Sequence, residues 1–187
     1  MVKEFTDGSQ ALALAQSLDL FMTKKKGVYI VGNIKDEICK KHNMGFWDKD
    51  EIFYDADIYE VENIENGSEL RVRNRKIKDA RDMELPYGIK HGSWLFAGCS
   101  KLKYPPKIPD SMTDCGFIFS RCISLKEAPE FPQNSNHFWA LENTPYALFF
   151  EKSKKDQITE KVLEFSFLGA LIGVMVCTIA LMIFSVM

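Results

Sequence analysis

The C-terminal end of the chain carries no charge. The chain has 24 basic and 26 acidic residues, and all of them lie at or before Glu164, so residues 165–187 contain none. As a helix, these 23 residues would span about 35 Å, which is enough to cross a hydrocarbon core of about 30 Å. A buried core helix is the alternative, but it would usually be shorter and more polar, and the hydroxyl groups here come only from Ser166, Thr178 and Ser185. The sequence therefore predicts a transmembrane helix over residues 162–187.

The residues before this segment determine the expected topology. Residues 151–161 form a basic juxtamembrane linker that contains Lys152, Lys154, Lys155 and Lys161. Positive residues favour the cytoplasmic side of a membrane, and no signal-peptide pattern is found at the N-terminus. We therefore expect a tail-anchored, single-pass membrane protein whose N-terminal domain lies in the cytoplasm. The four lysines are expected to lie against anionic headgroups of the lipid bilayer.

Small side chains recur every four residues within the apolar segment. Gly169, Gly173 and Cys177 would form one ridge along a helix. Such a ridge lets two membrane helices approach closely, which favours a homodimer packed through the transmembrane helix. Glycine is also common in membrane helices that do not associate, so the monomer stays open as an alternative.

The composition of the whole chain is that of one modest globular domain. The chain is 46% hydrophobic and 12% aromatic, which excludes a disordered or collagen-like protein. Its formal net charge is only -2 and its isoelectric point about 6.0, so no overall field would attract nucleic acid. We therefore expect no nucleic-acid partner.

Apolar periodicity predicts a small α/β capping region over residues 1–57. Residues 9–26 have the spacing of an amphipathic helix, which Gly27 would end. A short apolar strand is expected at 28–31, and a second helix at 34–43.

A β-hairpin is expected at 58–77. The dipeptide Asn66-Gly67 suits the positive dihedral angles of a type I′ turn. With these two residues as the turn, Glu62 would lie opposite Arg71, so that opposite charges face each other across the strands. The turn and the charge pattern therefore favour the same register.

A period of 23 residues follows the hairpin. Leu102, Leu125 and Leu148 lie 23 residues apart, and the string LPYGIKHGSWLFAGCSKL at 85–102 aligns with IPDSMTDCGFIFSRCISL at 108–125. A third copy is decayed, because Pro145 stands where the other copies have cysteine. This pattern is typical of a repeat protein whose last copy is a terminal cap.

The two well-kept copies resemble the leucine-rich repeats of the bacterial surface-antigen (BspA-like) type, which read L-P-x-S-[VIM] and then F-x-x-C-x-x-L. The resemblance covers about residues 85–148. It implies a right-handed solenoid with a short parallel strand in each turn and a binding role without catalytic residues. The expected fold class is therefore α+β, with a short leucine-rich-repeat-like β-solenoid in a region spanning 58–150. An N-terminal helix and the β-hairpin would cap this solenoid, and one C-terminal transmembrane helix would follow.

No motif in the sequence points to catalysis, a cofactor or a metal. Cys99 and Cys122 occupy equivalent repeat positions, which favours two buried apolar thiols. A zinc site that also used Cys115 and a histidine would lack any C-x-x-C or H-x-x-x-H pair. A solvated face without the spacing of an EF-hand is expected to carry the acidic residues Asp48, Asp50, Glu51, Asp55 and Asp57. We therefore expect no enzymatic activity, no cofactor and no bound metal.

These observations favour a membrane-attached, non-enzymatic module that binds an unidentified protein partner. Side chains on the repeat faces would make the contact, and the candidates are Lys90, His91, Thr113, Asp114 and Arg121. One alternative is a membrane-perturbing effector or holin-like oligomer with a soluble regulatory domain. Another is a structural component of a membrane-containing particle or virion.

Overall fold

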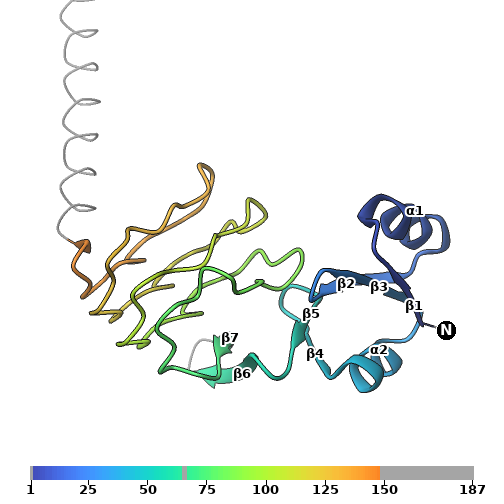
Figure 1. Cartoon of the computed structure of the whole chain (residues 1–187), viewed down its shortest axis with the longest axis horizontal. Helices are drawn as coiled ribbons and strands as arrows, with labels where there is room; N and C mark the ends of the chain where they lie inside the picture. Colours follow the sequence, from blue (N-terminus) through green and yellow to red (C-terminus); the bar gives the residue numbers. More distant parts are fainter. Residues whose placement is uncertain (1, 65–66, 148–187) are drawn as a thin grey trace, which may run out of the picture. The chain divides into compact units, whose positions relative to one another are not determined.

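The computed structural model describes residues 2–64 and 67–147, and residues 1–145 form one compact unit (Figure 1). The N-terminal half of this unit contains all the helices and strands that can be assigned in the described residues. In chain order these are β1 (Val2–Phe5), α1 (Gly8–Leu18), β2 (Phe21–Lys25), β3 (Val28–Gly32), α2 (Lys35–His42), β4 (Met44–Trp47), β5 (Ile52–Asp55), β6 (Tyr59–Ile64) and β7 (Gly67–Val72). The repeat region follows β7.

The first sheet has the strand order β1-β3-β2, with both pairs antiparallel, and the two helices cover its opposite faces (Figure 1). Successive side chains of a strand point to opposite faces. Accordingly, Val31 of β3 packs with Ala11 and Ala15 of α1, whereas Ile30 packs with Ile38 of α2. The expected strand at 28–31 and the expected helix at 34–43 are confirmed as β3 and α2.

The long helix expected at 9–26 is wrong. Helix α1 ends at Leu18, and the next residue, Asp19, adopts a left-handed conformation with φ of 51°. Its backbone N–H bonds back to the carbonyl of Ala15, as in a normal helix C-cap. Lys26 and Gly27 then form a tight turn with φ values of 52° and 77°, which suits a two-residue hairpin. The apolar residues after Leu18 therefore continue as strand β2.

Lys25 ties β2 to the end of α2. Its ammonium group donates to the carbonyl of His42 at 2.7 Å and to that of Asn43 at 3.3 Å. The same group lies 2.9 Å from a carboxylate oxygen of Asp55 at the end of β5. A cation at a helix C-terminus satisfies carbonyl groups that the helix leaves unbonded.

The hairpin expected around Asn66-Gly67 is present as β6 and β7, but its register is shifted. Glu60, not Glu62, lies opposite Arg71, because Ile64 pairs with Gly67. A shift of two residues keeps each side chain on its expected face. The expected ion pair between Glu62 and Arg71 is still present, because the two side chains meet diagonally across the strands at 3.3 Å.

The repeat region stacks in parallel, yet the expected fold class is wrong. Parallel bridges join His91 to Asp114 and Asp114 to Asn136, so the period predicted from the sequence is visible in the backbone. However, the bridges are isolated, and apart from them residues 73–146 contain only turns, bends and irregular segments. The strands of the described chain form small antiparallel sheets, and the repeats do not close into a leucine-rich-repeat-like β-solenoid.

Left-handed backbone positions explain why the repeats are made of turns. These positions recur in all three copies, at Trp94, Phe117 and Trp139 and again at Gly98, Arg121 and Asn143. The first set begins tight turns, in which the carbonyls of Trp94, Phe117 and Trp139 accept from the N–H three residues later. Because the chain reverses twice within a few residues, no parallel strand can extend along a copy.

The core of the stack repeats with the same period. Phe96 lies on Phe119 with the ring centroids 5.5 Å apart, and both side chains are fully buried. Cys99 and Cys122 are buried free thiols at equivalent positions, as expected. Matching apolar residues in each copy therefore build one continuous core.

Gly98 offers a test of the left-handed positions. Replacement of Gly98 by alanine should lower the free energy of unfolding by about 1 kcal/mol, because an alanine would have to adopt a φ of 78°. No atom lies within 4 Å of the added Cβ, so the loss would be conformational. Arg121→Ala is the matched control, since that position already holds a side chain at φ of 63° and should change by less than about 0.5 kcal/mol. Equal losses in urea denaturation would contradict this explanation.

Candidate binding groove on the loop edge

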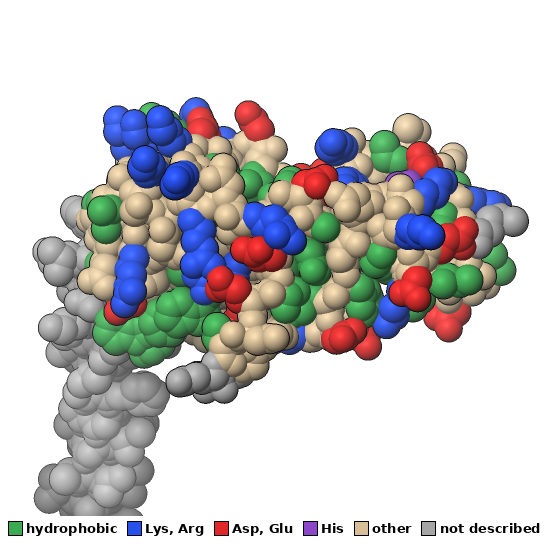
Figure 2. All heavy atoms as spheres, turned by 90° about the horizontal axis from the view of Figure 1, so that it is seen from below, with side chains coloured by type: hydrophobic (Ala, Val, Ile, Leu, Met, Phe, Trp, Pro, Cys, Tyr) green, Lys and Arg blue, Asp and Glu red, His purple; other side chains and the backbone are tan. Residues whose placement is uncertain are grey.

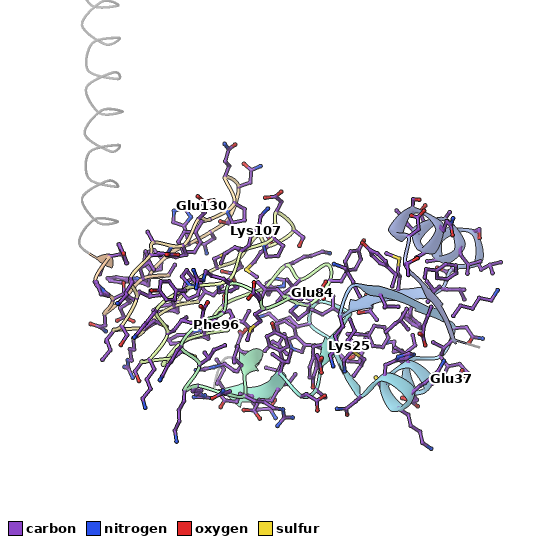
Figure 3. The ribbon with its side chains drawn as sticks, in the orientation of Figure 1. Lys25, Glu37, Glu84, Phe96, Lys107 and Glu130 are labelled. Carbon is purple, nitrogen blue, oxygen red and sulfur yellow. The ribbon has the colours of Figure 1, made fainter. Side chains whose placement is uncertain are left out.

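Three long loops lie at equivalent places in the repeats. They cover residues 82–88, 105–111 and 128–134, and they project from one edge of the stack (Figure 1). Six of the seven prolines of the chain are in these loops, at Pro86, Pro105, Pro106, Pro109, Pro129 and Pro132. Proline lacks an N–H group and fixes φ, so these loops cannot pair as strands and stay separate ridges. Figure 3 shows Lys107 and Glu130 on two neighbouring loops at this edge.

Hollows lie between the ridges. A cavity of about 520 Å³ lies between the β2-β3 turn and residues 79–86. A second, of about 620 Å³, lies between residues 83–88 and the next loop, and a third of about 310 Å³ lies between that loop and residues 127–132. Residues 83–86 line both the first and the second, and Lys107 and Asp110 line both the second and the third. The three cavities therefore form one row, which we call the loop-edge groove.

Glu84 joins the first ridge to the N-terminal sheet. Its carboxylate pairs with Lys24 and accepts from the N–H of Gly27 at 3.3 Å, and its carbonyl accepts from the hydroxyl of Tyr59 at 3.0 Å. The hydrogen bond to Glu84 raises the pKa of Lys24, and burial raises the pKa of Tyr59 well above its ordinary value. Figure 3 shows Glu84 and Lys25 at this junction. The wall of the first cavity is therefore held by charged and neutral hydrogen bonds.

The loop-edge groove has a negative balance of charge. Among the described residues, several charged side chains that line it form no ion pair. The acidic ones are Asp82, Asp110, Glu127 and Glu130, and the basic ones are Lys26 and Lys107. A groove with this balance favours a ligand that carries positive charge.

The structure brings together four of the five partner-binding residues expected from the sequence, but away from this groove. The N–H groups of Thr113 and Asp114 donate to the carbonyl of Lys90 at 2.9 and 3.0 Å, and His91 bridges to Asp114. Arg121 lies at the left-handed turn farther along the same copy. The side chain of Asp114 accepts from the N–H of Gly116 at 3.0 Å, so it shapes its own turn. None of the five lines the cavities described above.

Asp50 does not lie on the solvated face expected for it. Its side chain is fully buried. One carboxylate oxygen accepts from the N–H of Lys90 at 2.8 Å and from that of His91 at 2.9 Å, and the other contacts the His91 ring. These two N–H groups correspond to those of Thr113 and Asp114, which donate to a backbone carbonyl of the copy before them. Asp50 therefore supplies the acceptor that a preceding copy would otherwise provide.

Three cysteine thiols of the described chain are buried in the packed core. The described residues contain no group of three side chains placed to hold a metal ion. Burial raises the pKa of Cys99 and Cys115 to about 11 and that of Cys122 to about 12. A thiol with such a pKa is almost entirely protonated at neutral pH and is a poor nucleophile.

Thiol labelling tests this burial. We expect the peptides that contain Cys99, Cys115 and Cys122 to remain unmodified by iodoacetamide at pH 8 in the folded protein, and to react fully in urea. Cys39 is only partly buried and should react first among these four. Mass mapping of tryptic peptides measures each site separately. Rapid labelling of Cys122 under native conditions would contradict the buried core.

Several expected features lie outside the described residues. They are the juxtamembrane lysines Lys152, Lys154, Lys155 and Lys161, and the helix-packing residues Gly169, Gly173 and Cys177. Within the described ranges, no helix is both long enough and apolar enough to cross a membrane. No protein-family model, curated protein or solved structure matches this chain. The resemblance to BspA-like repeats therefore stays a prediction.

Proposed function

We propose that this protein is a non-enzymatic, membrane-attached module that binds an extended segment of a protein partner in its loop-edge groove. The observation that carries the proposal is a row of three cavities. One lies between the β2-β3 turn and the first proline-rich loop, and the other two lie between neighbouring proline-rich loops. Shallow parallel ridges suit an extended chain that crosses them in turn. A deep enclosed pocket would instead suit a small molecule.

The charge of the groove indicates the chemistry of the segment. The unpaired carboxylates of Asp82, Asp110, Glu127 and Glu130 outnumber the unpaired ammonium groups of Lys26 and Lys107 in the described chain. A segment rich in lysine or arginine would bring opposite charges to these carboxylates. Charge complementarity of this kind mainly raises the rate of association and the specificity.

Membrane attachment rests on the uncharged segment at 165–187 and on the basic linker before it. An anchor confines both the module and a membrane-bound partner to two dimensions, which raises their effective concentration. A module with a modest intrinsic affinity could then bind selectively. Alkaline carbonate extraction tests the attachment. The full chain should stay with the membranes, and a chain without residues 165–187 should be released.

Site-specific photo-crosslinking tests the groove. A benzophenone amino acid would replace Tyr87 or Asp110, which line it, in the full chain expressed in its own cells. The matched control would carry the probe at Leu18 of α1, an exposed site that lines none of the three cavities. We expect the same protein to be captured from both groove positions and not from Leu18. Capture of nothing at the groove, or of the same protein at all three positions, would contradict the proposal.

A further inference from the structure

Lysine residues recur on the repeats at a face separate from the loop-edge groove. The chain reads KIK at 76–78, KLK at 101–103 and SLK at 124–126. The N–H of Lys103 donates to the carbonyl of Lys78 at 2.8 Å, and the N–H of Lys126 donates to that of Lys103 at 2.9 Å. These bonds place the three segments side by side on successive levels of the stack. We call this side the lysine face. It consists of Lys76, Lys78, Lys101, Lys103 and Lys126, of which Lys103 is half-buried and the other four are exposed.

The middle residue of each segment points inward. Leu102 and Leu125 are buried in the core, and Ile77, which is half-buried, occupies the equivalent place on the first level. Lys76 and Lys101 lie in the turns just before the inward residues, because the N–H of Ile77 bonds to the carbonyl of Asn74 and that of Leu102 bonds to the carbonyl of Cys99. Neighbouring levels lie about 4.8 Å apart. Lys78, Lys103 and Lys126 therefore form one column on successive levels, and together with Lys76 and Lys101 they make up one array of positive charge.

The array is not neutralised by the described residues. No ion pair is recorded for any of the five lysines in residues 2–64 and 67–147. The nearby Arg81 is already paired with Asp79 at 2.5 Å, and Arg75 pairs with Glu62. Figure 2 shows lysine and arginine side chains gathering over the repeat region, at the left of the view. Like charges at this spacing repel each other, so the array favours a ligand that carries many negative charges.

The surroundings of the array favour a flat ligand. Tyr104, the aromatic residue next to Lys103, is half-buried, and the guanidinium of Arg81 covers one face of its ring at 4.2 Å from the ring centroid, so this face is not open to a nucleic-acid base. The cavities described above do not include any of the five lysines. Lysines on successive levels that line none of these cavities suit the headgroups of a bilayer surface better than a rod-shaped polyanion.

We propose that the lysine face binds anionic phospholipid headgroups at a membrane surface. The choice of a bilayer as the anionic partner rests on the proposed membrane attachment. The lysine array is observed independently of that proposal. Electrostatic contacts of this type add together and weaken as salt concentration rises. The lysine face would hold the repeat region against a membrane and leave the loop-edge groove to bind a protein.

Vesicle capture tests this proposal. The full chain would be reconstituted in nanodiscs of neutral phosphatidylcholine and mixed with separate liposomes that contain phosphatidylserine. The variant K78Q/K103Q/K126Q removes one column of the array, and K3Q/K40Q/K41Q removes three exposed lysines outside both the array and the groove for the same change in net charge. We expect the first variant to bind the liposomes about tenfold more weakly than the wild type, and the second to bind nearly as well.

Three outcomes would overturn the proposal. They are equal losses in the two variants, no binding of the wild type to anionic liposomes, and tighter binding of the wild type to duplex DNA or polyaspartate than to the liposomes. Thermal unfolding of each variant checks that the substitutions leave the fold intact. Crosslinking from Tyr87 should be unchanged in K78Q/K103Q/K126Q. The liposome experiment therefore tests the lipid contact, and the crosslinking experiment separately tests the binding of a protein in the groove.

Discussion

Replacement of Asp50 by alanine should lower the free energy of unfolding by about 3 kcal/mol. The carboxylate is fully buried and accepts from the N–H groups of Lys90 and His91, at 2.8 and 2.9 Å. Its removal would leave both donors without an acceptor inside the protein, and each such loss costs about 1 to 3 kcal/mol. Urea denaturation followed by tryptophan fluorescence measures the change.

Two further substitutions make this test specific. Asp50→Asn keeps one oxygen acceptor and loses the charge, so it should cost about half as much as alanine. Asp48→Ala removes an exposed carboxylate from the same turn and should change stability by less than about 0.5 kcal/mol. Equal effects of Asp50→Ala and Asp48→Ala would show that Asp50 does not supply the missing acceptor.

Replacement of Phe119 by alanine should lower the free energy of unfolding by about 4 kcal/mol. Phe119 is fully buried in the middle copy, between Phe96 at 5.5 Å and Phe131 at 6.4 Å between ring centroids. The substitution would remove contacts with the copies on both sides and leave a cavity that the stack cannot fill.

Ile123→Ala is the control for this second test. Ile123 belongs to the same copy but is 63% exposed, so its loss should cost less than about 0.5 kcal/mol. The comparison uses the same urea titration. A small effect of Phe119→Ala, similar to that of Ile123→Ala, would contradict a continuous core through the copies.

Local signals in the sequence predicted some elements correctly. The apolar run at 28–31 and the periodic segment at 34–43 are strand β3 and helix α2. The helix expected at 9–26 failed because Phe21 and Met22 fit both a helical face and a strand. The pairing of β2 with β3 decides between them, and it depends on the turn at Lys26-Gly27.

The period of the repeats could be predicted from the sequence, but the backbone conformation of the repeats could not. Leucine and cysteine at fixed spacing predicted the matching core positions of the copies. However, Trp94, Phe117 and Arg121 adopt positive φ, which their residue types do not indicate. The turns that these residues form replace the parallel strands implied by the resemblance.

The candidate sites differ in how far the sequence could reveal them. The prolines of the loop-edge groove recur at the repeat spacing, so the ridges could have been found from that pattern. The lysine face is harder to see, because KIK and KLK lie 25 residues apart while KLK and SLK lie 23 apart. Asp50 accepts from residues about 40 positions away, and no local pattern predicts such a contact.

The most direct test of the account measures the affinity of the partner captured from Tyr87. Binding to the full chain in nanodiscs would be compared for the wild type, for D110K/E130K in the groove, and for D48K/E51K outside it. Both variants change the net charge equally. We predict that the groove variant binds about tenfold more weakly and that the control binds like the wild type. Equal affinities for all three proteins, or equal losses in both variants, would contradict the proposal that the loop-edge groove binds the partner.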